Sequence, residues 1–112
     1  MAKRVMIVDD EALIAIEFEF WLQDEGHEVA GIAGDLDTAI SVLDRGPVDA
    51  VLLDANLDGV SSAPLAEAFR DRGVPFAVVS GYSRDQIDWL RDEPLVSKPV
   101  DYGMLSEVVR DL

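Results

Sequence analysis

The sequence predicts an α/β fold in which helices cover both faces of a doubly wound, five-stranded parallel sheet. Short apolar runs rich in β-branched residues alternate five times with stretches of helical composition. The connections are a few residues long, and the chain has no internal repeat or low-complexity linker. Several apolar runs stop abruptly at polar residues, as buried strands do at the edge of a sheet. With right-handed crossovers we expect five helices and strand order 2-1-3-4-5, in which strands one and three flank the ligand-binding crevice.

The first half of the chain contains two predicted strand-helix units. A buried strand over residues 4–8 is followed by a helix over 12–24, and Gly26 is placed to end that helix. A second strand over 29–32 leads into a second helix over 37–45.

The second half continues the same alternation, with one weaker signal. A strand over 51–53 ends at Asp54, and Ser61 or Ser62 can cap a helix that ends at Gly73. The remaining predicted elements are a strand over 75–79, a weak helix over 83–92, a strand over 95–97 and a last helix that begins after Lys98 and Pro99.

Composition narrows the function. With 112 residues the chain forms one domain, 1–112, because domains cluster at about 100–150 residues. Its net charge of −14 repels nucleic acid and anionic membrane surfaces, so we expect neither as a partner. There is no cysteine for a disulfide or a thiolate metal site. The apolar run at the N-terminus is too short for a signal peptide or a membrane helix, so we expect a cytoplasmic protein.

Carboxylates follow two of the predicted strands. Asp9 and Asp10 end the first and Asp54 ends the third, so all three should face each other across the crevice. Converging carboxylates repel each other unless a cation neutralises them, and an all-oxygen ligand set favours Mg²⁺. Ser80 and Lys98 end the fourth and fifth strands, so a hydroxyl and an ammonium group arrive at the same edge. These groups suit phosphoryl transfer to an aspartate.

Taken together and in this order, the five groups resemble those of the receiver domains of two-component response regulators, and the resemblance spans the whole chain. It implies a flavodoxin-like fold with Asp54 as the phosphoacceptor. It also implies that Asp10 and Asp54 bind Mg²⁺ directly, that Asp9 acts mainly through a water molecule, and that the backbone carbonyl of Asn56 completes the protein ligands.

The same resemblance implies that Ser80 is the switch residue that hydrogen-bonds the phosphoryl group and that Lys98 pairs with that group. Two positions depart from the usual pattern: Gly81 replaces the usual Ala, and Leu95 replaces the usual aromatic residue three positions before the lysine. The run PFAVVSGY instead resembles the atypical FATGUY subgroup, in which Tyr82 would take over part of the aromatic residue's role. We expect residues 80–89 to be mobile without phosphate and to order on phosphorylation.

The helix over 12–24 carries a second apolar stripe, formed by Leu13, Ile16 and Phe20. An amphipathic surface helix needs only one such stripe. The second is therefore either covered by a neighbouring helix or open to a partner. Because kinase helices usually approach receivers along their first helix, the resemblance favours a docking surface for the phosphodonor.

The leading interpretation is a signalling module that accepts a phosphoryl group on Asp54 from a histidine kinase or a histidine phosphotransfer protein. It would assist its own phosphorylation and dephosphorylation without being an enzyme in the ordinary sense. Because the sequence ends at the last predicted helix, we expect no output domain in this chain. Output would then pass to an unknown downstream protein, or the chain would serve as a phosphate sink or shuttle.

Three other interpretations are weaker. In a phosphohydrolase of the haloacid-dehalogenase type an acid stands two residues after the nucleophile, whereas this chain has Asn56. A flavodoxin-like redox module needs a phosphate-binding loop after the first strand, and three consecutive acidic residues, 9–11, oppose that. A receiver that cannot be phosphorylated is disfavoured because all five site groups are present.

Overall fold

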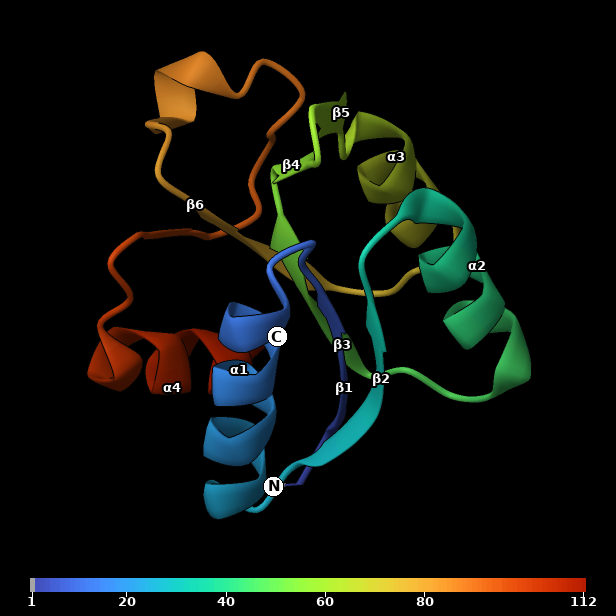
Figure 1. Ribbon diagram of the computed structural model, residues 1–112, viewed down its shortest axis with the longest axis vertical. Coiled ribbons are helices and arrows are strands. Elements are labelled where there is room, and N and C mark those ends of the chain that lie inside the picture. The colour runs from blue at the N-terminus through green and yellow to red at the C-terminus, as the bar shows by residue number, and fades with distance from the viewer. Residues whose placement is uncertain (1) are drawn as a thin grey trace.

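The sheet has the predicted order. The computed structural model describes residues 2–112, and its main sheet holds five parallel strands in the order β2-β1-β3-β6-β7. The strands are β1 (Arg4–Val8), β2 (Glu28–Ala33), β3 (Ala50–Asp54), β6 (Phe76–Ser80) and β7 (Leu95–Ser97). In order along the chain these are strands one to five, so the order is the predicted 2-1-3-4-5 (Figure 1).

Helices cover both faces of this sheet, and each face has its own hydrophobic core (Figure 1). On one face α1 (Ala12–Asp24) and α4 (Tyr102–Asp111) pack against β1, β3 and β6. On the other face lie α2 (Leu36–Arg45) and α3 (Ala63–Asp71). None of the helices in residues 2–112 has the length and apolar character that a membrane crossing requires.

The helix predicted over 83–92 is wrong. Between β6 and β7 the chain forms one 3₁₀ turn, η1 (Arg84–Gln86), so residues 2–112 contain four α-helices instead of five. Ser83 and Gln86 form a capping box that closes this turn, and Ile87 then leaves helical geometry at φ −111° and ψ 86°. Ile87 is buried, and Trp89 and Leu90 pack against the same core. Residues two positions apart, such as Ile87 and Trp89, point about 200° apart on a helix and cannot both face the core. Burying both therefore favours a non-helical backbone here.

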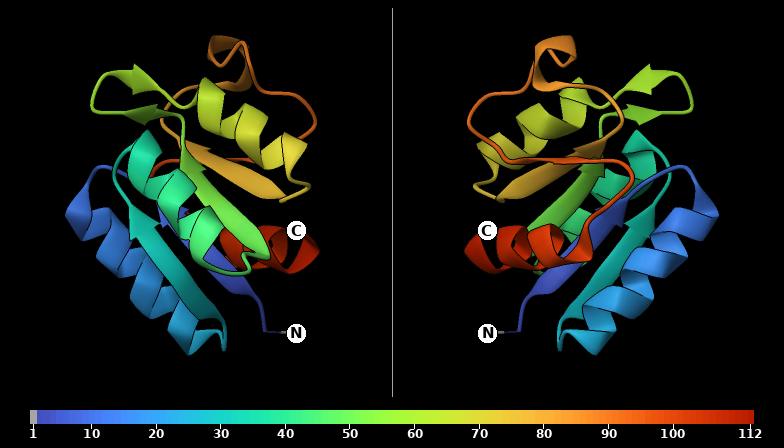
Figure 2. Two further views of the ribbon diagram at one scale, coloured as in Figure 1. Left: turned by 90° about the vertical axis from the view of Figure 1, so that its right-hand side faces the viewer. Right: turned by 90° about the vertical axis from the view of Figure 1, so that its left-hand side faces the viewer.

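A short hairpin follows β3 that was not predicted as strands. It consists of β4 (Asn56–Leu57) and β5 (Val60–Ser61), paired antiparallel. The two residues between them, Asp58 and Gly59, have φ of 51° and 81°. Positive φ at both central positions is typical of a tight type I′ turn, which Asp-Gly favours. The hairpin and the connection between β6 and β7 stand beyond the carboxyl ends of the main strands (Figure 2).

Candidate functional site

Three carboxylates meet at the carboxyl end of the sheet. In the register of β1 and β3, Val8 lies beside Leu53, so the residues that follow, Asp9 and Asp54, come out next to each other. One carboxylate oxygen from each of Asp9, Asp10 and Asp54 lies within 4.8 Å of the others. Asp9 and Asp54 are buried, whereas Asp10 is exposed. The predicted convergence is therefore present.

Asp9 shows the electrostatic strain of this arrangement. Burial raises the pKa of Asp9 to about 6, and the nearby charge of Asp54 adds to the increase. A hydrogen bond from the backbone N–H of Glu11 to Asp9 Oδ1, 2.8 Å long, and the positive charge of Lys98 act in the opposite direction. A divalent cation would stabilise the ionised carboxylates, and the all-oxygen donor set fits Mg²⁺.

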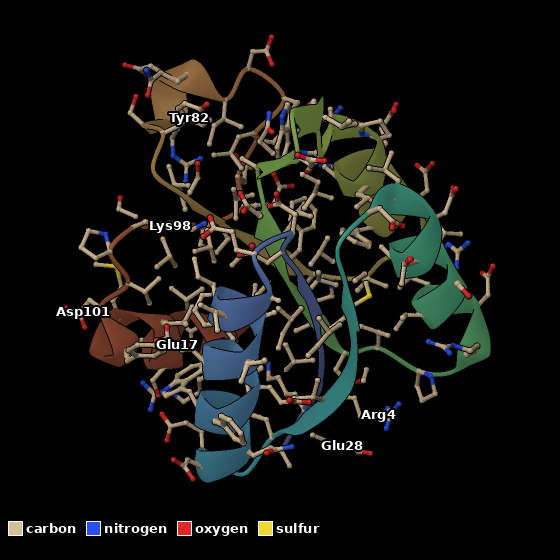
Figure 3. All side chains as sticks on the ribbon, viewed as in Figure 1. Arg4, Glu17, Glu28, Tyr82, Lys98 and Asp101 are labelled. Carbon is tan, nitrogen blue, oxygen red and sulfur yellow. The ribbon has the colours of Figure 1, made fainter. Side chains whose placement is uncertain are left out.

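Lys98 projects from the end of β7 toward these carboxylates (Figure 3). Its Nζ lies 3.3 Å from Asp54 Oδ2 and 3.8 Å from Asp9 Oδ2. Its backbone N–H donates to the carbonyl of Ser80 at 3.0 Å, and the following peptide bond to Pro99 is cis. The ammonium group is thus already beside Asp54, as the sequence predicted.

Ser80 is buried at the end of β6, opposite Ser97 of β7. Its Oγ accepts a hydrogen bond of 3.0 Å from the backbone N–H of Tyr82. The Tyr82 side chain is half exposed (Figure 3). The two residues are therefore linked through the Tyr82 backbone, with the phenol ring at the surface.

Two hydrogen bonds tie the β4–β5 hairpin to the site, and a third lies within the hairpin. Asn56 donates its backbone N–H to Asp54 Oδ1 at 3.3 Å, and its side-chain Oδ1 accepts from the N–H of Gly59 at 2.8 Å. The backbone N–H of Asp58 donates to Asp10 Oδ2 at 3.1 Å. These bonds fix the hairpin against both carboxylates. The predicted ligand role of the Asn56 carbonyl stays a prediction.

Ser62 is a contributor that the sequence analysis missed. It was predicted as a possible helix cap and does stand before α3, but its side chain makes no capping hydrogen bond. Its fully buried hydroxyl instead donates to the backbone carbonyl of Asp54. No local sequence pattern predicts this contact, because it depends on how the hairpin returns the chain to β3.

The second apolar stripe of α1 is exposed to solvent. Leu13, Ile16 and Phe20 are exposed to 80%, 43% and 63%, whereas Phe18 and Leu22 of the same helix are buried. Of the two alternatives left open by the sequence, cover by a neighbouring helix is therefore excluded within residues 2–112. Its use as a docking surface stays a prediction.

This sheet order, with carboxylates after β1 and β3 and a serine and a lysine after β6 and β7, defines a class of signalling domain. The family model of the response regulator receiver domain matches residues 5–110, and the chain belongs to that family. It is thus a receiver domain of the kind found in two-component signalling systems.

Individual relatives support the same assignment. The transcriptional regulatory protein PdtaR of Mycobacterium tuberculosis is 31% identical over 111 residues, which cover 96% of this chain and 53% of PdtaR. The crystal structure of the response regulator PhyR from Brucella abortus superposes with a TM-score of 0.84 at 33% identity, over 97% of this chain and 46% of that one. The chain therefore spans about half the length of these relatives. Similarity to PhyR fits the atypical subgroup named above.

A third relative has been solved with a metal and a phosphoryl mimic. The response regulator TrrA from Thermotoga maritima, in complex with Mg²⁺ and BeF, superposes with a TM-score of 0.84 at 30% identity. The match covers 97% of each chain.

Proposed function

We propose that this receiver domain accepts a phosphoryl group on Asp54 from a phosphohistidine of a kinase or phosphotransfer protein, in a Mg²⁺-dependent reaction. One observation carries the proposal: the carboxylates of Asp9, Asp10 and Asp54 converge within 4.8 Å while Lys98 Nζ lies 3.3 Å from Asp54. A nucleophile, a cation site and a fixed ammonium group are the parts that phosphoryl transfer to a carboxylate requires.

In the proposed step an oxygen of Asp54 attacks the phosphorus of the phosphohistidine, and the P–N bond breaks. The imidazole nitrogen keeps the bonding electron pair and leaves as a neutral ring once protonated, and Asp54 becomes an acyl phosphate. Asp10, Asp54 and the Asn56 carbonyl would hold Mg²⁺ directly, with Asp9 acting through water. When bound, the ion neutralises the charge on the transferred oxygens.

Lys98 and Ser80 would stabilise the product. Lys98 already lies beside Asp54 Oδ2, so a small movement exchanges the carboxylate for a phosphoryl oxygen. The hydroxyl of Ser80 would donate to another phosphoryl oxygen. Reorienting this hydroxyl weakens the bond that it accepts from the N–H of Tyr82, so the start of the β6–β7 connection would report the state of Asp54.

The stripe of Leu13, Ile16 and Phe20 is our proposed docking surface for the phosphodonor, because it is exposed and apolar on the helix that follows Asp9 and Asp10. A changed β6–β7 connection would be recognised by a downstream protein, which we leave unidentified. A role as phosphate sink or shuttle would use the same chemistry without that second partner.

The direct test is labelling with acetyl phosphate and Mg²⁺, followed by intact mass measurement. We expect the wild type to gain the mass of one phosphoryl group, and the gain to disappear in Asp54→Asn or when Mg²⁺ is chelated. Asp58→Asn is the matched control, because Asp58 lies in the exposed hairpin turn outside the carboxylate cluster. Equal labelling of the wild type and Asp54→Asn would refute the proposal.

A further inference from the structure

The connection between β6 and β7, residues 81–94, holds its shape largely through arginine side chains instead of an α-helix. Two arginines from different places in the chain, Arg70 and Arg84, converge on Glu93. Figure 1 shows this connection, in orange, leaving the end of β6 and folding back toward the sheet.

Arg70, in the last turn of α3, makes three hydrogen bonds to this connection. Its Nε donates to Glu93 Oε2 at 3.0 Å, and one terminal nitrogen donates both to Glu93 Oε1 at 2.8 Å and to the carbonyl of Trp89 at 2.9 Å. The guanidinium also lies over the ring of Phe76, 5.6 Å from its centroid. Both side chains of the ion pair are mostly buried, with 18% and 17% exposed. Such a forked, partly desolvated pair is much stronger than an open surface ion pair.

Arg84 closes the same region from inside the connection. Its two terminal nitrogens donate to the carbonyls of Arg91 and Glu93, at 2.8 Å and 2.9 Å. The Glu93 carboxylate also accepts from the N–H of Arg91 at 3.0 Å. The next carbonyl, that of Pro94, accepts from Val78 and begins the pairing with β6. We call Arg70, Arg84 and Glu93 the arginine clamp.

The other end of the connection is held differently. Tyr82 is bound through the hydroxyl of Ser80, and Ser83 through a 2.9 Å bond from its N–H to the side chain of Gln86. Residues 81–86 are all exposed. The β6 end of the connection thus depends on the Ser80 hydroxyl at the site, and the β7 end depends on the ion pair between Glu93 and Arg70 of α3.

We propose that the arginine clamp is a positioning device that divides this connection in two. It fixes residues 89–94 and the entry into β7, so that a change at Ser80 is confined to residues 81–87. Because β7 leads directly to Lys98, the clamp also keeps that ammonium aligned with Asp54 while the readout segment moves. The claim that the change at Ser80 is confined to residues 81–87 rests on the proposed function, whereas the claim that the clamp anchors residues 89–94 does not.

The anchoring is tested on the unphosphorylated protein by amide hydrogen exchange of Arg70→Met. The matched control is Arg72→Met, which removes the same residue type two positions along, from an open ion pair with Asp44 whose side chains are 41% and 59% exposed. We expect exchange at residues 89–93 to become at least about tenfold faster in Arg70→Met and to stay unchanged in Arg72→Met. Arg84→Met, at an exposed position, should produce a smaller increase at 91–93. Equal exchange in Arg70→Met and Arg72→Met would overturn the anchoring.

The confinement is tested by adding Mg²⁺ and beryllium fluoride. In the wild type we expect exchange to change at 81–87 and not at 89–93, and in Arg70→Met we expect the change to extend to 93. A wild-type change that already covers 89–93 to the same degree would overturn the division. If amide exchange in the wild type changed nowhere on addition of Mg²⁺ and beryllium fluoride, the proposed function would be refuted. The comparison of Arg70→Met with Arg72→Met would still test whether the clamp anchors residues 89–94.

Discussion

Replacing Ser62 with Ala should weaken both the fold and the phosphorylation site. The Ser62 hydroxyl is fully buried and donates to the backbone carbonyl of Asp54, so the substitution removes this hydrogen bond from a buried position. A lost hydrogen bond costs about 0.5–1.5 kcal/mol, and about 1–3 kcal/mol when a buried partner is left unpaired. Since α3 packs against the same core as β3, we expect a loss of about 1–2 kcal/mol in the free energy of unfolding.

Urea unfolding followed by tryptophan fluorescence measures this loss. The expected change is a lower midpoint with an unchanged slope, or a melting temperature lower by about 4–8 °C for each kcal/mol. Ser61→Ala is the control, because Ser61 is exposed and its hydroxyl accepts from the N–H of Ala63, 3.1 Å away. In Ser62→Ala labelling by acetyl phosphate should also be slower, since the carbonyl beside the nucleophile loses its support. The reasoning would be refuted if Ser62→Ala and Ser61→Ala were equally stable.

Three further predictions concern other parts of the molecule. Hydrogen bonds from Arg70 hold the pKa of Glu93 below its usual 4.5, so they stabilise the folded protein above that pH and cease to do so as the pH falls through the lowered pKa. The difference in free energy of unfolding between wild type and Glu93→Gln, measured with urea, should therefore shrink toward zero in acid. Gly31→Ala should lower the free energy of unfolding by about 1–3 kcal/mol, because its Cβ would lie 2.9 Å from Val42 Cγ2. The same substitution should cost less in a Val42→Ala background, and additive effects of the two substitutions would exclude this clash as the cause. Phe20→Ala should slow phosphotransfer from a kinase and leave acetyl phosphate labelling unchanged, and equal transfer rates would remove Phe20 from the docking surface.

The strand ends could be predicted from the sequence because their signal is local. A buried parallel strand is a continuous apolar run, and the run stops where the chain meets water, as at Asp54 and Ser80. The crossover rule then places those ends together without any knowledge of the tertiary contacts. For this reason both the sheet order and the convergence of the acidic groups followed from the sequence.

The missed features depend on contacts between distant residues. Arg70 and Glu93 are 23 positions apart, and their bond competes with the weak helical pattern over 83–92. The spacing of Ile87 and Leu90 resembles a helix, but no local signal shows that carbonyls near them already have arginine partners. Ser62 is similar: its hydroxyl reaches the Asp54 carbonyl only because a hairpin folds the chain back.

The pairing of β7 with β6 limits how this domain can send a signal. β7 has three residues, lies at the edge of the sheet and, within residues 2–112, pairs with β6 alone. The N–H of Lys98 donates to the carbonyl of Ser80, so the two residues proposed to grip the phosphoryl group belong to one pair of strands. Because the arginine clamp holds the residues that lead into β7, the Ser80 hydroxyl can turn while this backbone pairing stays in register. Under the proposed division, a partner that binds along the free edge of β7 would meet the same backbone in both states of Asp54. A partner that distinguishes the two states would instead have to contact the exposed residues 81–86.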